Sequence, residues 1–309
     1  MPAKNKNNSH ARFNIVAISL VAALLVGGLG FVSYQIKSSL DREIYGTSRG
    51  EVGQENPSDL GYDYEPVEFK SSNTTEKELT ISGWFIDGNT DDCIILAPGK
   101  GKSRWEILDY VPFLHEEGYD LLLFDPQGRG KSDGEKWGFG YFESRDIVNA
   151  AQYLEENHGV ENIGLLGRSA GASASLMAAL ETEKVDAVVA DSPFASIKLA
   201  SESYGNYENN PLFDLLFPLY GHGANRALDT DIIKKTDLTE RISSLRKPVF
   251  FIHGEADQVI YPKNGKVLHE NKPGEKELWT PEEVGHVGGF EDKPEEYKRR
   301  VAGFFDECI

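Results

Sequence analysis

A serine flanked by two glycines is the most chemically suggestive feature of the sequence. Residues 163–174 are typical of a short buried strand, a sharp turn at Gly167-x-Ser169-x-Gly171, and a helix of small residues. The glycines let strand and helix approach closely, which pushes the serine hydroxyl outward. The helix N-terminus then favours negative charge developing beside the hydroxyl. The spacing predicts that Ser169 is a nucleophile; the alternative is a serine in an ordinary turn.

A serine hydroxyl needs a general base, and the base needs an acid that orients it. His286 lies in a glycine-rich loop after the last expected strand, and Asp257 closely follows the strand before it. His269 falls within a helical stretch and is the weaker candidate for the base. Asp191, at the end of an earlier strand, is the alternative acid. We predict that Ser169, His286 and Asp257 form a catalytic triad.

An acyl-transfer site also needs donors for the oxyanion that forms on the attacked carbonyl. The apolar run 93–97 ends in Pro98-Gly99-Lys100-Gly101-Lys102-Ser103, a loop that can approach a substrate closely. The backbone N–H groups of Lys100 and Ala170 are the predicted donors. The lysines of this loop could also bind phosphate, but their spacing does not match a nucleotide-binding loop.

Alternating strands and helices must position these residues. After an antiparallel start, continuous apolar runs of the kind found in sheets buried on both faces alternate with helical stretches. This pattern predicts an α/β fold with a mostly parallel, twisted sheet and helices on both faces. The strands are expected at 67–70, 79–86, 93–97, 119–125, 162–167, 185–190, 248–253 and 276–280.

One segment, at about 195–235, interrupts the alternation because it contains no strand candidate. It is rich in aromatic residues, so we expect a helical lid over the site. A packed helical hairpin without a role in substrate binding is the alternative. The lid residues expected to contact substrate are Tyr204, Tyr207, Phe213 and Phe217.

The N-terminal region predicts a membrane anchor. Residues 15–32 are apolar except for Ser19, and as a helix they would be about 27 Å long, close to the bilayer core of about 30 Å. Lys4, Lys6 and Arg12 precede the run, which predicts a cytoplasmic tail (1–14), a signal-anchor helix (15–36), a linker (37–64) and an extracellular catalytic domain. A cleaved signal peptide, and hence a secreted protein, is the alternative.

Residues 65–309 resemble the α/β-hydrolase superfamily. The N-terminal anchor and Asp191-Ser-Pro-Phe194 are similar to poorly characterised membrane-anchored hydrolases of Gram-positive bacteria. The oxyanion loop departs from the pattern, because Pro98-Gly99 stands where many members have His-Gly. The motifs that carry the resemblance are Phe124-Asp125-x-x-Gly128-x-Gly130-x-Ser132, Gly167-x-Ser169-x-Gly171, His253-Gly254-x-x-Asp257-x-x-Ile260-x-Pro262 and Gly285-His286.

The resemblance implies a serine hydrolase that cleaves a small-molecule ester, or a related acyl bond, through an acyl-enzyme. A peptidase or amidase using the same triad, and a silent membrane-tethered binding protein, are the alternatives. No cofactor or metal is implied, and the net charge of −18 argues against nucleic acid as a partner. The oligomeric state, and whether Cys93 and Cys308 form a disulfide, stay open.

Overall fold

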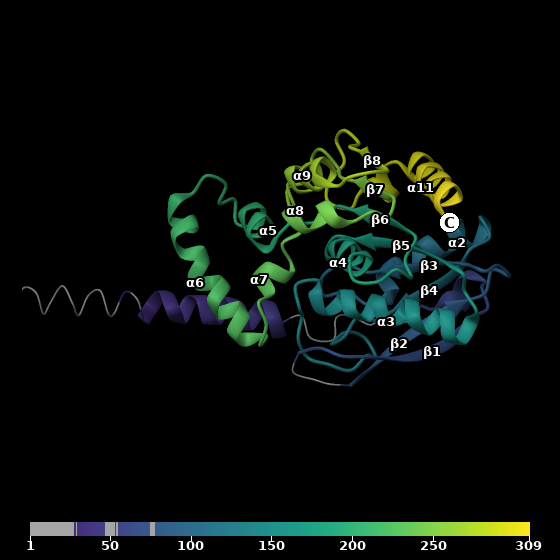
Figure 1. The fold of residues 1–309 in the computed structure, drawn as a ribbon, viewed down its shortest axis with the longest axis horizontal. Helices are drawn as coiled ribbons and strands as arrows, with labels where there is room; N and C mark the ends of the chain where they lie inside the picture. Colours follow the sequence, from purple (N-terminus) through teal and green to yellow (C-terminus); the bar gives the residue numbers. More distant parts are fainter. Residues whose placement is uncertain (1–27, 29, 47–52, 54, 75–77) are drawn as a thin grey trace, which may run out of the picture.

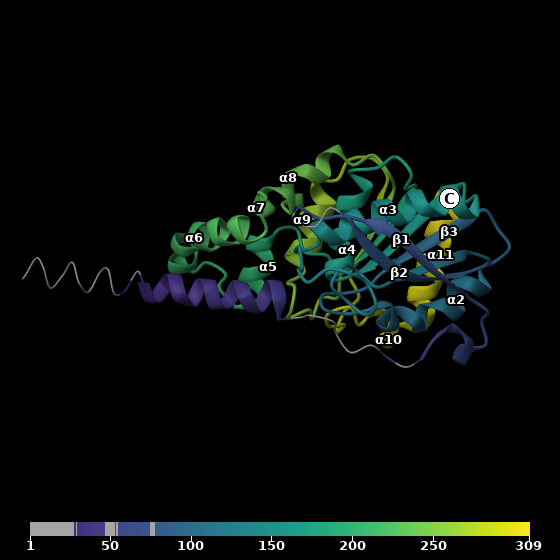
Figure 2. The same ribbon diagram turned by 90° about the horizontal axis from the view of Figure 1, so that it is seen from below.

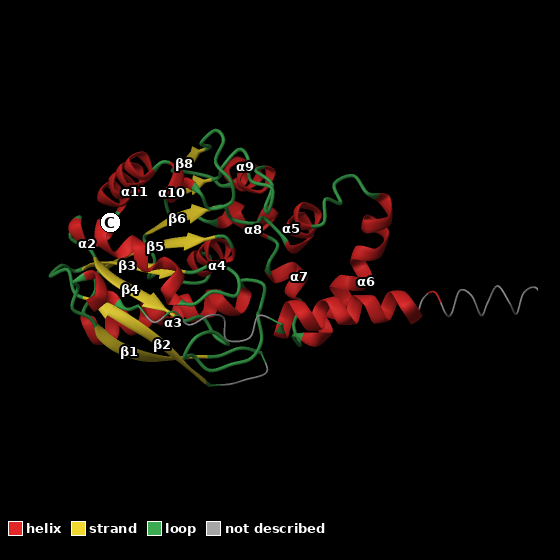
Figure 3. Cartoon of the chain, turned by 180° about the vertical axis from the view of Figure 1, so that it is seen from behind, coloured by secondary structure: helices red, strands yellow, loops and turns green. Residues whose placement is uncertain are grey.

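The computed structural model describes residues 28, 30–46, 53, 55–74 and 78–309. In this part of the chain, eight strands form one sheet in the order β1-β2-β4-β3-β5-β6-β7-β8 (Figures 1 and 3). β2 pairs antiparallel with β1 and with β4, and the other five pairings are parallel, so the mostly parallel sheet expected from the sequence is confirmed. The strands are β1 (Glu65–Ser71), β2 (Leu79–Ile86), β3 (Asp92–Ala97), β4 (Asp120–Phe124), β5 (Asn162–Arg168), β6 (Ala187–Asp191), β7 (Val249–Ile252) and β8 (Lys276–Trp279).

Helices cover both faces of this sheet (Figure 3). Successive side chains of a strand point to opposite faces, and β3 shows the consequence: Ile95 belongs to one buried cluster, whereas Ile94 and Leu96 belong to the other. The first cluster includes residues of α3 (Tyr141–His158), α4 (Ala170–Ala179), α8 (Leu238–Arg241) and α9 (Lys263–Asn271); the second includes residues of the 3₁₀ helix η2 (Arg104–Tyr110), α2 (Val111–Glu116) and α11 (Pro294–Cys308).

The aromatic-rich segment between β6 and β7 is helical. It forms α5 (Ile197–Tyr204), α6 (Pro211–Ala227) and α7 (Ile232–Lys235), and no strand occurs among residues 195–235, all of which the structure describes. Figures 1 and 2 show α5 and α6 projecting from the sheet on the side where the strands of the parallel part end. This placement lets the segment cover the carboxyl edge of the sheet.

A helix at residues 30–45 lies beside α6 in both views (Figures 1 and 2). Leu40 and Ile44 are buried, and Gly223 of α6 is so close that an added Cβ would lie 2.7 Å from Leu40 Cδ1. Residues 37–45, which the sequence analysis assigns to a linker, are therefore a packed helix. The first apolar residues of the expected anchor (15–27) lie outside the described residues. Among the helices that the structure describes, none is both long and apolar enough to cross a membrane.

The two cysteines are free thiols that lie in different parts of the fold. Cys93 is in β3 beside Asp120 of β4 and Ile163 of β5, at the middle of the sheet. Cys308 ends α11, and the charges that act on it come from Glu307 of the same helix and from residues 272–277 beside β8. Burial raises the pKa of both thiols, that of Cys308 to about 11, so neither is an activated nucleophile.

Candidate active site

The turn between β5 and α4 holds Ser169 in a strained conformation. Its backbone has φ 53° and ψ −117°, a region that residues other than glycine rarely adopt. A Cβ at Gly167 would lie 2.4 Å from the carbonyl oxygen of Gly171, and a Cβ at Gly171 would lie 2.2 Å from that of Ala97. Both glycines are therefore required sterically, which is the physical reason for the spacing seen in the sequence.

Ser169, His286 and Asp257 come together from three separate loops at the carboxyl edge of the sheet. His286 Nε2 lies 2.9 Å from Ser169 Oγ, and His286 Nδ1 lies 2.7 Å from Asp257 Oδ2. These distances let the serine proton pass to Nε2 while the carboxylate holds the proton on Nδ1. The structure thus brings together the three residues that the sequence analysis selects.

Asp257 is fully buried at the base of this chain of hydrogen bonds. Burial opposes its ionisation, but hydrogen bonds from the His253 and His286 side chains and the Ile260 amide outweigh burial and lower the pKa of Asp257. The amides of Val259 and Ile260 donate to Oδ1 at 2.8 and 2.9 Å. His253 Nε2 lies 3.3 Å from Oδ2, a partner that the sequence analysis did not anticipate.

The alternative candidates are engaged elsewhere. Asp191 accepts hydrogen bonds from Ser192 Oγ and from Tyr297 Oη, and burial raises its pKa. Its backbone oxygen accepts from the Ser169 amide at 2.7 Å, so Asp191 supports the turn rather than the base. His269 lies in α9, with its ring edge-on to Phe251.

The predicted oxyanion donors flank Ser169. Both Lys100 and Ala170 line the cavity that contains Ser169, and no described residue accepts a hydrogen bond from either backbone amide. The preceding amide, that of Gly99, donates to Glu106 Oε2 at 2.9 Å. Glu106 also lies 3.7 Å from Arg168 Nη1, so a charged side chain from η2 holds the loop beside the turn. No motif in the sequence identifies this role of Glu106.

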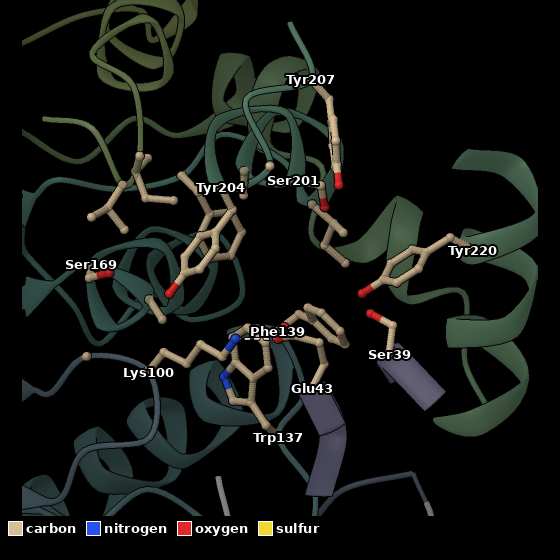
Figure 4. Close-up of a pocket in the computed structure, with 18 of the residues that line it drawn as sticks. Ser39, Glu43, Lys100, Trp137, Phe139, Ser169, Ser201, Tyr204, Tyr207 and Tyr220 are labelled. Carbon is tan, nitrogen blue, oxygen red and sulfur yellow. Dashed lines mark hydrogen bonds and ion pairs between the residues drawn. The ribbon is translucent and has the colours of Figure 1, made fainter. Parts of the chain in front are cut away.

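A cavity of about 630 Å³ opens onto Ser169 and His286. Figure 4 shows Ser169 on one side, with Ser39 and Tyr220 on the opposite side. All four lid residues selected from the sequence line it: Tyr204, Tyr207, Phe213 and Phe217. The apolar remainder of the wall consists of Ile36, Trp137, Phe139, Ala170, Phe194, Ile197, Ala200, Leu216, Tyr220, Val259, Ile260 and Val287.

The sequence analysis missed one wall of this cavity. Ile36, Ser39 and Glu43, from the N-terminal helix, all line it. Their spacing of three and four residues puts them on one helical face, but this signal was hidden because the segment adjoins the apolar run. In the ranges that the structure describes, no group of three or more His, Cys, Asp or Glu side chains is arranged to hold a metal ion.

Comparisons with known proteins agree with this geometry. A family model described as "Serine aminopeptidase, S33" matches residues 88–227, which include Ser169 but end before Asp257 and His286. The chain is 28% identical to the uncharacterized protein YqkD of Bacillus subtilis over 237 residues, covering 73% of this chain and 75% of that protein. It is 25% identical to YfhR of Escherichia coli K12 over 263 residues, covering 80% and 84%.

Among solved structures, the esterase Pf2001 of Pyrococcus furiosus aligns with a TM-score of 0.69 and 27% identity. The alignment covers 85% of this chain and 99% of that chain. The sheet order, the strained serine turn and these matches together lead to one classification. The chain has the α/β-hydrolase fold, and over residues 88–227 it is similar to hydrolases with that fold.

Proposed function

We propose that the protein is a serine esterase that cleaves esters with an apolar acyl group through an acyl-enzyme intermediate. The observation that carries the proposal is the continuous chain of hydrogen bonds from Ser169 Oγ through His286 to Asp257, at the wall of a mostly apolar cavity. An apolar acyl group would lie against the aromatic side chains of the lid.

The proposed reaction uses the triad in two steps. Ser169 Oγ attacks the ester carbonyl as its proton moves to His286 Nε2, and the Asp257 carboxylate stabilises the imidazolium. The amides of Lys100 and Ala170 stabilise the oxyanion. His286 then donates the proton to the leaving alcohol, and water hydrolyses the acyl-enzyme by the same route. The strained turn and the hydrogen bonds already formed support this because little reorganisation precedes attack.

Labelling with a fluorophosphonate probe tests the proposal directly. We expect the full-length chain to be labelled, and the Ser169→Ala variant to remain unlabelled and inactive with an unchanged melting temperature. Nitrophenyl esters of increasing acyl length provide the substrate series, and an acetyl ester provides the short reference. A folded Ser169→Ala variant that keeps esterase activity would refute the assignment of the nucleophile.

A peptidase or amidase is the second candidate, because the matching family model is described as a serine aminopeptidase. The same triad can attack an amide carbonyl, so the two candidates differ in the substrate that the cavity holds. Aminoacyl nitroanilides assayed beside the esters separate them. A kcat/KM for nitroanilides above that for every ester would replace the esterase proposal with this one.

We also propose that the protein is anchored in the cell membrane, with the catalytic domain outside. The apolar residues 15–32, preceded by three basic residues, support this. The described helix adds exposed Phe31 and Tyr34, and aromatic residues are enriched where anchors leave a bilayer. We expect the protein to stay with membranes after an alkaline wash and to be digested by protease added outside cells. Release by the wash, or a shortened chain in the medium, would contradict the anchor.

A further inference from the structure

The Lys100 side chain reaches away from Ser169 toward the N-terminal helix. Its Nζ forms an ion pair with Glu43, and Nζ also lies 4.4 Å from the centre of the Trp137 ring. Figure 4 shows Lys100, Glu43 and Trp137 together on one wall of the cavity. The residue that offers its amide to the oxyanion is therefore held, through its side chain, by a helix more than fifty positions earlier in the chain.

The helix that carries Glu43 is itself fixed in place. Leu40 and Ile44 are 4% and 0% exposed, and the Trp137 amide donates to the carbonyl oxygen of Ile44 at 2.9 Å. Glu43 lies on the side of the helix that lines the cavity, together with Ser39. Its carboxylate is thus presented to Lys100 by a packed segment and not by a free surface side chain.

The other contacts of the loop hold the residues on either side of Lys100. The Gly99 amide donates to Glu106 Oε2, and the Lys102 amide donates to the Gly99 carbonyl oxygen at 3.1 Å, which closes a turn in which Gly101 has φ +72°. Lys100 itself is held through its side chain. The side chains of Lys100 and Glu43 are 25% and 34% exposed. In this half-buried setting an ion pair is stronger and less screened than on an open surface.

We propose that Glu43 is a positioning residue. Its ion pair with the Lys100 side chain keeps the Lys100 backbone amide directed toward the oxyanion. This inference rests on the proposed serine hydrolase function. An oxyanion donor acts mainly in the transition state, since charge develops there. Removing the Glu43 charge therefore lowers kcat while binding of the ground-state ester is retained.

The test uses the full-length chain and the isosteric variant Glu43→Gln. We expect kcat for a nitrophenyl ester to fall about tenfold, with KM changed less than about twofold. The matched control is Asp41→Asn, which removes the same charge from the same helix but at an exposed side chain paired with Lys37. We expect the control to keep wild-type kcat. Equal kcat in Glu43→Gln and Asp41→Asn would overturn the proposal.

A double-mutant cycle separates positioning from simple tethering of the helix. If Glu43 acts through Lys100, then Glu43→Gln together with Lys100→Gln lowers kcat no further than Lys100→Gln alone. Additive losses of kcat in the double variant would contradict the proposal. So would a kcat loss that disappears when each protein is assayed the same number of degrees below its own melting temperature. Failure of the proposed hydrolase function can be told apart from failure of this inference, because the wild-type protein would then show neither ester turnover nor labelling of Ser169.

Discussion

Gly171 offers a stringent test of how closely the serine turn must pack against the oxyanion loop. It is the second residue of α4, directly after Ala170, whose amide is a predicted donor. In Gly171→Ala the new Cβ would lie 2.2 Å from the carbonyl oxygen of Ala97 and 2.5 Å from that of Pro98. Both are backbone atoms at the end of β3, a central strand, so they cannot move aside as a flexible side chain would.

The size of the effect follows from this contact. The distance must grow by about 1 Å before it becomes an ordinary contact, which moves the start of α4 away from the loop that carries Lys100. Overpacking of this kind costs about 1–3 kcal/mol of stability. In a domain of this size, each kcal/mol lowers the melting temperature by roughly 2–4 °C. A displacement of about 1 Å at the reacting groups lowers kcat/KM about a hundredfold.

The assay measures melting temperature and esterase kcat/KM for Gly171→Ala beside Gly303→Ala. Gly303 lies in α11, and an added Cβ there meets no atom within 4 Å. The control substitution should raise stability by about 0.5–1 kcal/mol and leave activity unchanged, because alanine suits a helix interior better than glycine. A Gly171→Ala protein with wild-type kcat/KM and melting temperature would refute the packing argument.

Two further predictions follow from the acid and from the far wall of the cavity. Asp257→Asn should lower kcat/KM about 10⁴-fold. The same substitution should also change the pH dependence of stability. Because folding lowers the pKa of Asp257, its carboxylate stabilises the fold above about pH 4, and this contribution is lost as the pH falls further. Urea unfolding should therefore show a larger stability difference between wild type and variant at pH 7 than at pH 3, and an equal difference would contradict it. Ile36→Trp should lower kcat/KM about tenfold for long-chain esters and leave kcat/KM for the acetyl ester unchanged, since Ile36 lines the cavity from the N-terminal helix. An equal loss for both esters would show that this wall does not limit the length of acyl chain that the cavity accepts.

The triad could be selected from the sequence because local signals and chain order define it. Ser169 and Asp257 follow the buried strands β5 and β7, and His286 follows the short edge strand β8. The carboxyl ends of parallel strands meet at one edge of a sheet. Glu43 could not be selected, because its role depends on a helix packing against α6, a contact between segments far apart in the chain. Glu106 was missed for a related reason: a single glutamate in a 3₁₀ helix has no spacing that marks its bond to the Gly99 amide.

The packed N-terminal helix has a consequence for how this protein can diverge. Ser169 and His286 reach the cavity from loops of the sheet, whereas Ile36, Ser39 and Glu43 reach it from a helix near the start of the chain. Mutations at Ile36 or Ser39 can therefore change the shape of the cavity while Ser169, His286 and Asp257 stay unchanged. A recombination or truncation near residue 46 would go further, because it would also remove Glu43 and with it the ion pair to Lys100.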